Sequence, residues 1–551
     1  MLFPPVNVDC PKKGLAILHA LKTMIAGLIS NKSRFMSRPA LAKSEILIVF
    51  VVLFIGACLP ILSVKLPPLG DYANHLARMH IIAHVGNDPF LSQYFTITWG
   101  IIPNLAFDIL VPPLLHLLDV FVAGKIFVIA VVLMLVTGPM ALSWALTRQL
   151  SLAPLLAFGF IYNGFFMLGL MNYLFGVGLA MWATATWIIL RERAGWLFVL
   201  QSLAFTLALF FCHLYAVGLF LLAIGSYELW SWQQRLFKLD RRLFLTGLLF
   251  VAMLGFAFAL LLNGPTWNLS GAYDWDDQGK IEGIALIFRL YDDKFDLVVL
   301  IAFLAGLGIG LRLRILHLHP AGIVCLILSI GLYLAMPTTL FGSMMADQRL
   351  PIAGLLFAIG FVRLTLPSQT GRLVFVSVLT LICIVRFGEV ASRWQQIDVY
   401  VQEFQQAIAL LPQGARVMVA QADEAYGPAA LNDGMSHIPC LAVIDRSALV
   451  TSLFTVSGKQ ILGVRHPYSE IVDRDDGYLP NMSQLIAAEG MTPSNDPFWA
   501  TWFQDHDYVF EMFAAPDSEN ANPERLELIY RGSKFHLFRV IKDTTEDEEK
   551  P

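Results

Sequence analysis

The sequence predicts an all-α polytopic membrane bundle of about eleven transmembrane helices, followed by a small C-terminal α/β soluble domain. Of its 551 residues, 57% are hydrophobic and only 15% are charged, whereas a soluble chain averages about 25% charged residues. The charges lie in short connections and in residues 389–551, with long apolar runs between them. Six scattered cysteines form no disulfide framework and no paired metal motif.

Residues 1–44 form a basic N-terminal segment that we expect on the cytoplasmic side. The weakly apolar stretch 14–30 contains His19 and Lys22, so we interpret it as a cytoplasmic or interfacial helix. A signal peptide is the alternative, but no convincing cleavage site follows it. The first clear span is 45–64, and it begins beside the basic flank.

Later apolar runs supply the other spans, since about 20 helical residues cross the hydrocarbon core. Run 151–190 is too long for one span and should break near Asn172-Tyr173, and run 197–232 should break at Cys212-His213. Eleven spans result when these are counted with 45–64 and with the runs at 122–147, 243–262, 295–311, 320–336, 350–366 and 372–388.

Basic residues in short connections define the topology, because they prefer the cytoplasmic ends of spans. All of them face one side if run 103–118, which contains Asp108 and Pro112-Pro113, lies on the membrane surface. If that run crossed instead, every later loop would invert. The residues concerned are Arg148, Arg191, Arg193, Arg235, Lys238, Arg241, Arg242, Arg312, Arg314, Arg363 and Arg372.

This topology divides the chain into the segment 1–44, a membrane domain over 45–388 with outside loops 65–121 and 263–294, and an outside domain over 389–551. A shorter outside loop covers 337–349. In the tail, an amphipathic helix is predicted at 397–411, and residues 543–551 are acidic and predicted to be disordered. Strands are predicted at Arg416–Ala420, Leu441–Ile444, Tyr508–Met512, Leu526–Tyr530 and Phe535–Ile541.

The most informative segment runs from Leu66 to Arg78. Its prolines and Gly70 end the first span, and a helix from Asp71 onward would place Asp71, Asn74, His75 and Arg78 on one face. The plain alternative is that Asp71 caps the helix, Arg78 binds lipid headgroups and His75 is a surface residue. Polar groups at membrane depth are costly and often functional, which favours a site.

Other polar residues should gather on the same side of the membrane. Arg349 precedes a span, where its planar fork suits a phosphate; the alternatives are a salt bridge to Asp347 or a lipid contact. His213 is otherwise a satisfied helix-end histidine. Further candidates are Asn172 and Tyr173, Tyr215, and the second-loop residues Trp267, Tyr273, Asp274, Asp276 and Asp277. The aspartates are otherwise a solvated loop, and their oxygens leave a divalent cation open.

In architecture the chain resembles the GT-C superfamily of membrane glycosyltransferases, which includes protein O-mannosyltransferases and lipid A aminoarabinose transferases. The likeness consists of an acidic residue just after span one, surface helices in that first loop, a second long loop after span seven, and a soluble outside tail. It covers most of residues 45–390. The segment from Gly70 to Arg78 also resembles a motif of bacterial membrane proteins.

The resemblance implies inverting transfer of a sugar from a polyprenyl-phosphate donor to a lipid, glycan or protein acceptor outside the membrane. It implies that Asp71 is the general base, that His75 orients Asp71 or binds phosphate, and that Arg349 and Arg78 neutralise the leaving phosphate. Asn74, His213, Asn172 and Tyr273 are the other substrate-binding candidates. Several family members carry a second acid beside the first, whereas Tyr72 follows Asp71 here, a departure that leaves the base and any metal open.

We therefore expect a multi-pass protein of a bacterial inner membrane, in contact with membrane lipids, with no nucleic-acid partner and no certain cofactor. Two other functions stay open. A transporter or lipid flippase would use charges buried at the midplane, for which Glu228 is the main candidate. A non-catalytic envelope assembly or sensor protein would use the tail, where His437, Cys440, Asp445 and His466 show no recognisable catalytic spacing.

Overall fold

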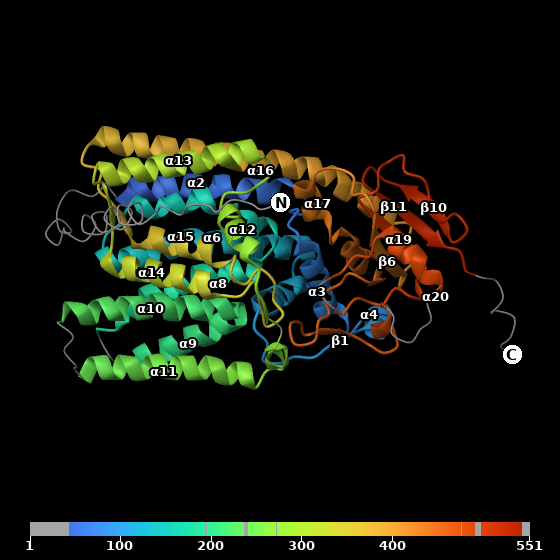
Figure 1. Ribbon diagram of the computed structural model, residues 1–551, viewed down its shortest axis with the longest axis horizontal. Helices are drawn as coiled ribbons and strands as arrows, with labels where there is room; N and C mark the ends of the chain where they lie inside the picture. Colours follow the sequence, from blue (N-terminus) through green and yellow to red (C-terminus); the bar gives the residue numbers. More distant parts are fainter. Residues whose placement is uncertain are drawn as a thin grey trace, which may run out of the picture.

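The computed structural model describes residues 43–192, 195–235, 241–271, 273–474, 477–490 and 497–542. Helices that run side by side form a long bundle, and the C-terminal domain covers one end of it (Figure 1). We call this end of the bundle the domain end. The helix expected within 14–30, the basic residues Arg193 and Lys238, and the acidic tail 543–551 lie outside the described residues.

The predicted membrane bundle with a small sheet domain is confirmed. Seven of the described helices are long and apolar enough to cross a membrane, namely α2 (Lys43–Ser63), α6 (Val120–Thr147), α8 (Met171–Leu190), α10 (Leu214–Gln234), α11 (Arg241–Leu262), α13 (Asp293–Arg312) and α16 (Gln369–Ile408). Three shorter apolar helices run beside them (Figure 1), namely α9 (Trp196–Cys212), α14 (Pro320–Ala335) and α15 (Leu350–Phe361). The breaks expected near Asn172 and at Cys212-His213 fall where α8 begins and α9 ends.

The third expected span differs from the prediction, because residues 151–170 form no long α-helix. They fold into the 3₁₀ helix η2 (Ala153–Phe160) and the single turn α7 (Gly164–Met167). Such backbone is tolerated at membrane depth only where protein covers it, and η2 packs among α2, α6, α15 and α16. The fully buried Asn163 accepts from two backbone N–H groups and donates to two carbonyls at this junction.

A second difference concerns α16, which is one continuous helix where a span at 372–388 and a separate helix at 397–411 were expected. Its 40 residues extend about 60 Å at a rise of about 1.5 Å each, roughly twice the hydrocarbon thickness. The helix continues from the bundle into the C-terminal domain (Figure 1). Its amphipathic face at Ile397, Val401 and Phe404 is buried, and the Phe404 ring stacks on that of Phe535 at 3.7 Å. One rigid rod therefore connects the bundle to the domain.

The loops at the domain end carry short elements. The first loop holds α3 (Tyr72–His84), α4 (Pro89–Tyr94), β1 (Phe95–Ile97), α5 (Ala106–Leu110) and η1 (Pro112–His116). The second loop holds η3 (Pro265–Leu269), β2 (Tyr273–Asp274) and α12 (Asp277–Ala285), and β2 pairs with β4 (Thr339–Leu340). Within run 103–118, α5 and η1 have five residues each, and neither is long enough to cross a bilayer. At the far end, β3 (Leu316–Leu318) pairs with β5 (Val362–Leu364).

The C-terminal domain is built on a five-stranded mixed sheet of order β10-β11-β9-β6-β7. Strand β6 runs parallel to β7 and β9, while β9, β11 and β10 are antiparallel. The strands are β6 (Arg416–Gln421), β7 (Leu449–Val450), β9 (Tyr508–Met512), β10 (Leu526–Arg531) and β11 (Phe535–Val540). The short helices are α17 (Ala429–Asn432), η4 (Asp433–Met435), η5 (Ile438–Cys440), α18 (Leu441–Arg446), η6 (Tyr468–Glu470), α19 (Met482–Ala487), η7 (Ala488–Gly490) and α20 (Trp502–Asp505).

The strand predicted at Leu441–Ile444 is wrong, because these residues begin α18. Four consecutive apolar residues do not distinguish a buried strand from a buried helix turn. The segment packs against α3 and α16, and the left-handed Ser447 ends it at φ +49°. Tertiary packing therefore decides its conformation.

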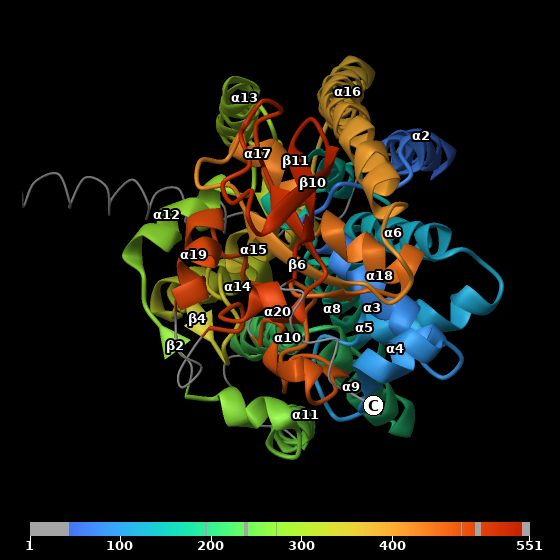
Figure 2. The same ribbon diagram turned by 90° about the vertical axis from the view of Figure 1, so that its right-hand side faces the viewer.

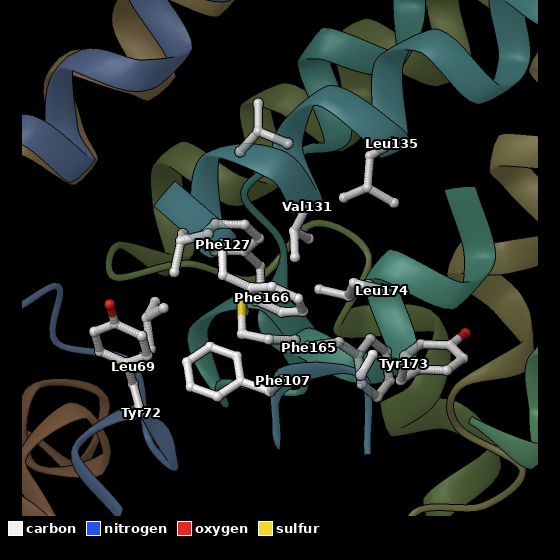
Figure 3. Close-up of a cluster of buried hydrophobic side chains, with 14 of the residues drawn as sticks. Leu69, Tyr72, Phe107, Phe127, Val131, Leu135, Phe165, Phe166, Tyr173 and Leu174 are labelled. Atoms are coloured by element: carbon white, nitrogen blue, oxygen red, sulfur yellow. The ribbon is translucent and has the colours of Figure 1, made fainter. Parts of the chain in front are cut away.

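The first loop and the C-terminal domain form one structural unit, and α3 packs against α18 (Figure 2). Strand β1 pairs antiparallel with β8 (Leu462–Val464), and Asp88 accepts a hydrogen bond of 2.6 Å from Ser447. Below this unit, an aromatic cluster packs α3 and α5 on α6 and α8 (Figure 3). The ring of Phe107 lies 4.6 Å from that of Phe127 and 6.3 Å from that of Tyr72, both in edge-on geometry.

A prediction follows from the close contact of α6 with α8. A Cβ atom on Gly178 would lie 2.5 Å from the carbonyl carbon of Met134, so Gly178→Ala should separate the helices at a cost of about 1–3 kcal/mol. Gly218→Ala in α10 is the matched control, because nothing lies within 4 Å of its Cβ position. We expect a lower melting temperature for the first variant in lipid nanodiscs, and an unchanged or higher one for the second. Equal melting temperatures would contradict the packing described.

Candidate functional site

A cavity of about 340 Å³ lies at the domain end, where the bundle meets the C-terminal domain. Seven segments that are far apart in the sequence line it: the start of α3, Pro103-Asn104, the turn at 168–173, the junction at 213–215, Thr266, the loop 340–349, and residues 437–460 of the C-terminal domain. Of the predicted site residues, it brings together Asp71, His75, Asn172, His213 and Arg349. The cavity is therefore shared between the membrane bundle and the soluble domain.

Asp71 lines the cavity at the first residue before α3. Its backbone N–H donates to the carbonyl of Leu168 at 3.0 Å, and that of Gly70 donates to Met167 at 2.8 Å. The approach is close enough to require Gly169, whose φ is +84° and whose Cβ would lie 2.8 Å from the Asp71 nitrogen. The Asp71 carboxylate makes no capping hydrogen bond to α3, so helix capping does not explain its presence.

Arg349 also lines the cavity and contacts several neutral groups. One terminal nitrogen, Nη1, donates to Nε2 of His213 at 2.8 Å, and the other donates to the Ser343 hydroxyl and the Met344 carbonyl. The guanidinium lies 5.8 Å from the ring centre of Tyr173 and 5.7 Å from that of Tyr215, within the range of cation–π attraction. These contacts orient a buried cation beside the cavity.

The salt bridge considered for Arg349 goes to another partner. Asp347 is fully buried and pairs with Lys280 of α12 at 2.7 Å, and the Lys280 ammonium also donates to the carbonyls of Tyr333 and Met336. Asp347 therefore neutralises the Lys280 ammonium of α12 and not the guanidinium of Arg349.

The loop 341–345 forms part of the wall in an unusual backbone conformation. Phe341 and Met345 have positive φ values of 52° and 57°, which is costly for residues with side chains. Two cations hold the loop, since Arg349 binds Ser343 and Met344, and Lys459 from the C-terminal domain donates to the Gly342 carbonyl at 2.6 Å. Both cations also line the cavity, so an anion bound there would compete with the loop for them.

Asn74 does not line the cavity. It connects α3 to the C-terminal domain beside it. It is fully buried, its Oδ1 accepts from the Phe454 N–H at 3.1 Å, and its Nδ2 donates to the Ser452 carbonyl at 2.9 Å. Nδ2 also lies 3.4 Å from Nδ1 of His437. Both ends of its side-chain amide face the C-terminal domain, so Asn74 holds α3 and this domain together.

Two other candidates have structural partners. The side chain of Asn172 reaches the cavity, but its amide accepts from the Phe107 N–H at 2.8 Å and donates to the Asn104 carbonyl at 2.7 Å, which anchors the first loop on α8. Tyr273 belongs to β2, is 65% exposed and lies outside the cavity lining. We therefore place neither at the centre of the site.

Arg78 also lies apart from the cavity. Its side chain is fully buried, with Nε 2.6 Å from Oδ1 of Asp108 and Nη2 3.1 Å from Oδ2. This ion pair with two hydrogen bonds joins α3 to α5. It occupies the two N–H groups with which the guanidinium would otherwise bind a phosphate. Both residues are in the predicted first loop, but their pairing across 30 positions has no signal in the sequence.

The C-terminal domain adds residues that the sequence does not indicate as site residues, chiefly His437, Phe454, Lys459 and Gln460. They lie more than 350 residues after Asp71, and only the folded chain brings them to it. As for a metal, the described residues contain no group of three or more His, Cys, Asp or Glu side chains placed to hold one. The divalent cation stays a prediction.

No protein-family model matches the chain, and its sequence matches no curated protein. Among solved structures, the chain is similar to the crystal structure of ArnT from Cupriavidus metallidurans bound to undecaprenyl phosphate. The two share 11% sequence identity with a TM-score of 0.49, over 91% of this chain and 99% of that chain. The function proposed below therefore rests on this chain's own residues.

The Arg78–Asp108 pair yields a prediction that separates a structural role from substrate binding. Arg78→Met or Asp108→Leu alone leaves one buried charge unpaired, which costs about 3–5 kcal/mol. The double variant Arg78→Met/Asp108→Leu removes both charges and should recover much of the lost melting temperature in nanodiscs. Single variants that fold as well as the wild type would contradict the structural role.

The second prediction concerns pH. Burial lowers the pKa of His437 and of His506 to about 4, against about 6.5 in an unfolded chain. Since the unfolded chain then takes up protons at a higher pH than the folded chain, stability is full above pH ~6.5 and decreases as the pH falls toward ~4.

The check is the melting temperature of the chain in nanodiscs over that pH range. His506→Gln, which lies away from the cavity, should make the decrease shallower. A wild-type melting temperature that is constant between pH ~6.5 and ~4 would contradict the burial of these imidazoles.

Proposed function

We propose that this chain is a membrane glycosyltransferase that moves a sugar from a polyprenyl-phosphate carrier to an acceptor hydroxyl, with inversion. The observation that supports it best is one shared cavity: a carboxylate from the first loop, Asp71, and a buried cation, Arg349, line the same space at the domain end of an apolar bundle. A base and a phosphate-binding group are the two parts that this reaction requires.

The chemistry assigns one task to each. Asp71 takes the proton of the acceptor hydroxyl while that oxygen attacks the anomeric carbon of the donor sugar. The bond from this carbon to the phosphate oxygen breaks, and the polyprenyl phosphate leaves with the bonding electron pair. Negative charge develops on the leaving oxygen, and a pre-oriented guanidinium in a water-poor cavity stabilises it.

His213 acts as a positioning residue for Arg349. Its Nε2 lies 2.8 Å from Nη1 of Arg349, and its Nδ1 lies 3.2 Å from the backbone nitrogen of Tyr215, so the imidazole lies between the guanidinium and the start of α10. Together with the rings of Tyr173 and Tyr215, it holds the plane of the guanidinium. Pre-organisation of this kind leaves little reorganisation for the reaction step.

The apolar surroundings favour a lipid-linked donor. Side chains such as Leu168, Leu214 and Met344 line the cavity beside the polar groups, and Met344 is 64% exposed. An apolar route from the cavity into the bilayer would accommodate a polyprenyl chain, which explains why the catalyst is part of a membrane bundle. We place the cavity on the non-cytoplasmic side of a bacterial inner membrane, on the strength of the basic residues at the far end.

The transporter alternative receives no comparable support. Its main candidate, Glu228, accepts from Arg191 at 2.8 Å and from the Trp187 indole at 2.9 Å, which are the contacts of a structural pair between α8 and α10. The buried Asp296 likewise pairs with Arg386 at 3.2 Å. These charges are satisfied within the bundle, and no second cavity is needed to explain them.

The first test of the function is Asp71→Asn, which keeps the shape of the side chain and removes the base. We expect loss of transfer by at least about 100-fold, with normal abundance, because asparagine keeps the size and shape of the side chain. Envelope glycolipids and cell-wall glycans of a strain carrying the variant should match those of a deletion strain by mass spectrometry. Asp276→Asn, an acid of the second loop outside the cavity lining, is the control that should retain the wild-type profile. Normal transfer by Asp71→Asn would remove Asp71 from the mechanism.

The second test replaces the cation. Arg349→Gln should lower transfer about 10²–10³-fold, the loss typical for one group that stabilises a developing negative charge. Arg349→Lys keeps the charge but not the fork and should retain part of the activity. Arg289→Gln is the control, because this exposed arginine pairs with Glu282 away from the cavity. Activity that depends equally on Arg289 and Arg349 would point to a general charge effect.

A further inference from the structure

Two histidines from different parts of the chain lie at the cavity wall beside Asp71. His75 lies one helical turn after Asp71 on α3, and its backbone N–H donates to the Asp71 carbonyl at 3.0 Å. Its side chain is 7% exposed and lies between the rings of Phe107 and Phe454, 5.7 Å and 6.2 Å away. Among the described residues, none forms a hydrogen bond with its Nδ1, which leaves binding capacity unused in a buried place.

His437 comes from the C-terminal domain and is held in one orientation. A Cβ on Gly477 would lie 2.7 Å from its Cε1 atom, and the Phe454 ring packs on it at 4.8 Å. Because Oδ1 of Asn74 accepts from Phe454, its Nδ2 is the group that faces Nδ1 of His437. That contact places the His437 proton on Nε2, so this imidazole can donate a hydrogen bond, and a neutral His75 ring has one acceptor nitrogen and one donor nitrogen.

The two histidines are uncharged near neutral pH. Burial lowers the pKa of His437 to about 4. Burial first, and then the neighbouring Arg78 and His437, lower the pKa of His75 well below its usual value. The histidines and the Phe454 ring thus offer neutral hydrogen-bonding groups and an aromatic face, whereas the cations in the lining are Arg349 and Lys459, which donates to the Gly342 carbonyl. We call the part of the lining formed by His75, His437 and Phe454 the histidine wall, and the part around Arg349 the Arg349 wall.

We propose that His75 and His437, with the ring of Phe454, form the acceptor subsite, and that it takes an uncharged saccharide hydroxyl group. This inference rests on the proposed glycosyl transfer and makes the C-terminal domain a determinant of acceptor choice. A hydroxyl is both donor and acceptor, which matches the two imidazoles. An aromatic face beside them suits the apolar face of a pyranose ring.

The position of Asp71 assigns this wall to the acceptor and not to the donor sugar. The base must reach the hydroxyl proton that it removes, and Asp71 and His75 stack on the same helix face one turn apart. A group held by His75 is therefore the group beside the base. The donor phosphate belongs with Arg349, and its sugar lies between the two.

Charge argues against an acidic acceptor at this wall. A neutral imidazole does not compensate a carboxylate or phosphate, and burying an unpaired anion is costly. A site built to hydrogen-bond a hydroxyl also discriminates strongly against a ligand that lacks it. Neutral pyranosides should therefore bind better than their acidic counterparts once the Arg349 wall is occupied.

The test measures ligand binding to the full chain in nanodiscs by ligand-observed NMR. Farnesyl phosphate at saturation serves as the probe for the Arg349 wall, and methyl α-glucopyranoside and its glucuronide serve as probes for the histidine wall. His437→Leu removes both imidazole nitrogens, and His437→Gln retains a donor and an acceptor. His506→Gln is the matched control, because this histidine is also buried in the same domain but lies outside the cavity lining.

We expect the glucopyranoside to bind the wild type more tightly than the glucuronide does. His437→Leu should weaken glucopyranoside binding about 10-fold, the loss of roughly one hydrogen bond, whereas His437→Gln and His506→Gln should change it less than about 3-fold. The affinity for farnesyl phosphate should be the same in the wild type and in the three variants. Unchanged glucopyranoside binding in His437→Leu, no glucopyranoside binding by the wild type, or preference for the glucuronide would each overturn the subsite.

Two further outcomes separate the inference from the function on which it rests. A wild type that does not bind farnesyl phosphate would overturn the proposed function, whereas farnesyl phosphate binding without any effect of His437 would overturn the subsite alone. Farnesyl phosphate that carries a glucose fills the position of the donor sugar. If it leaves glucopyranoside binding unchanged, the acceptor assignment is supported; if it displaces the glucopyranoside, the wall belongs to the donor sugar.

Discussion

The buried amide of Asn74 is the contact on which the site depends. It joins α3 to residues 437–454 through hydrogen bonds to the Phe454 N–H and the Ser452 carbonyl, and it faces His437. With the β1–β8 pairing and the packing of α18 on α3, it holds the C-terminal domain against the helix that follows Asp71. A buried amide that satisfies its partners also imposes a single orientation, because any other docking would leave polar groups unpaired. The cavity is thus a consequence of how two parts of the chain dock.

Charge pairing gives this cavity its polarity. Arg78, Arg191, Arg386 and the partly buried Lys280 each have a carboxylate partner, in Asp108, Glu228, Asp296 and Asp347 respectively. Arg349, which lines the cavity, contacts an imidazole, a hydroxyl, a carbonyl and two aromatic rings. A guanidinium in a low-dielectric place interacts strongly with an anion. In the proposed site the charged donor belongs with Arg349, and the uncharged acceptor belongs with the two histidines.

The outline of the fold follows from composition, while its exceptions follow from packing. Apolar runs and basic flanks predict the bundle, and the break at Cys212-His213 is found. Residues 151–170, however, are as apolar as a helix yet form η2 and α7, because neighbouring helices and Asn163 satisfy their backbone. The run Leu441–Ile444 likewise becomes helical under the packing of α3 and α16. Burial on all sides removes the periodicity from which a prediction could be made.

For the site, the sequence by itself determined the local chemistry: a turn at Gly70, a helix that presents Asp71 and His75 on one face, and an arginine just before a span. Helical periodicity is a local property, so these features are visible without a fold. Only the tertiary structure decided that Arg78 pairs with Asp108 and that Asp347 pairs with Lys280. It also decided that Arg349 lines the cavity, and that His437 lines it together with Asp71, more than 350 residues earlier in the sequence. Such pairings depend on which surfaces meet when apolar area and polar groups are buried together, and no short-range pattern in a chain encodes that.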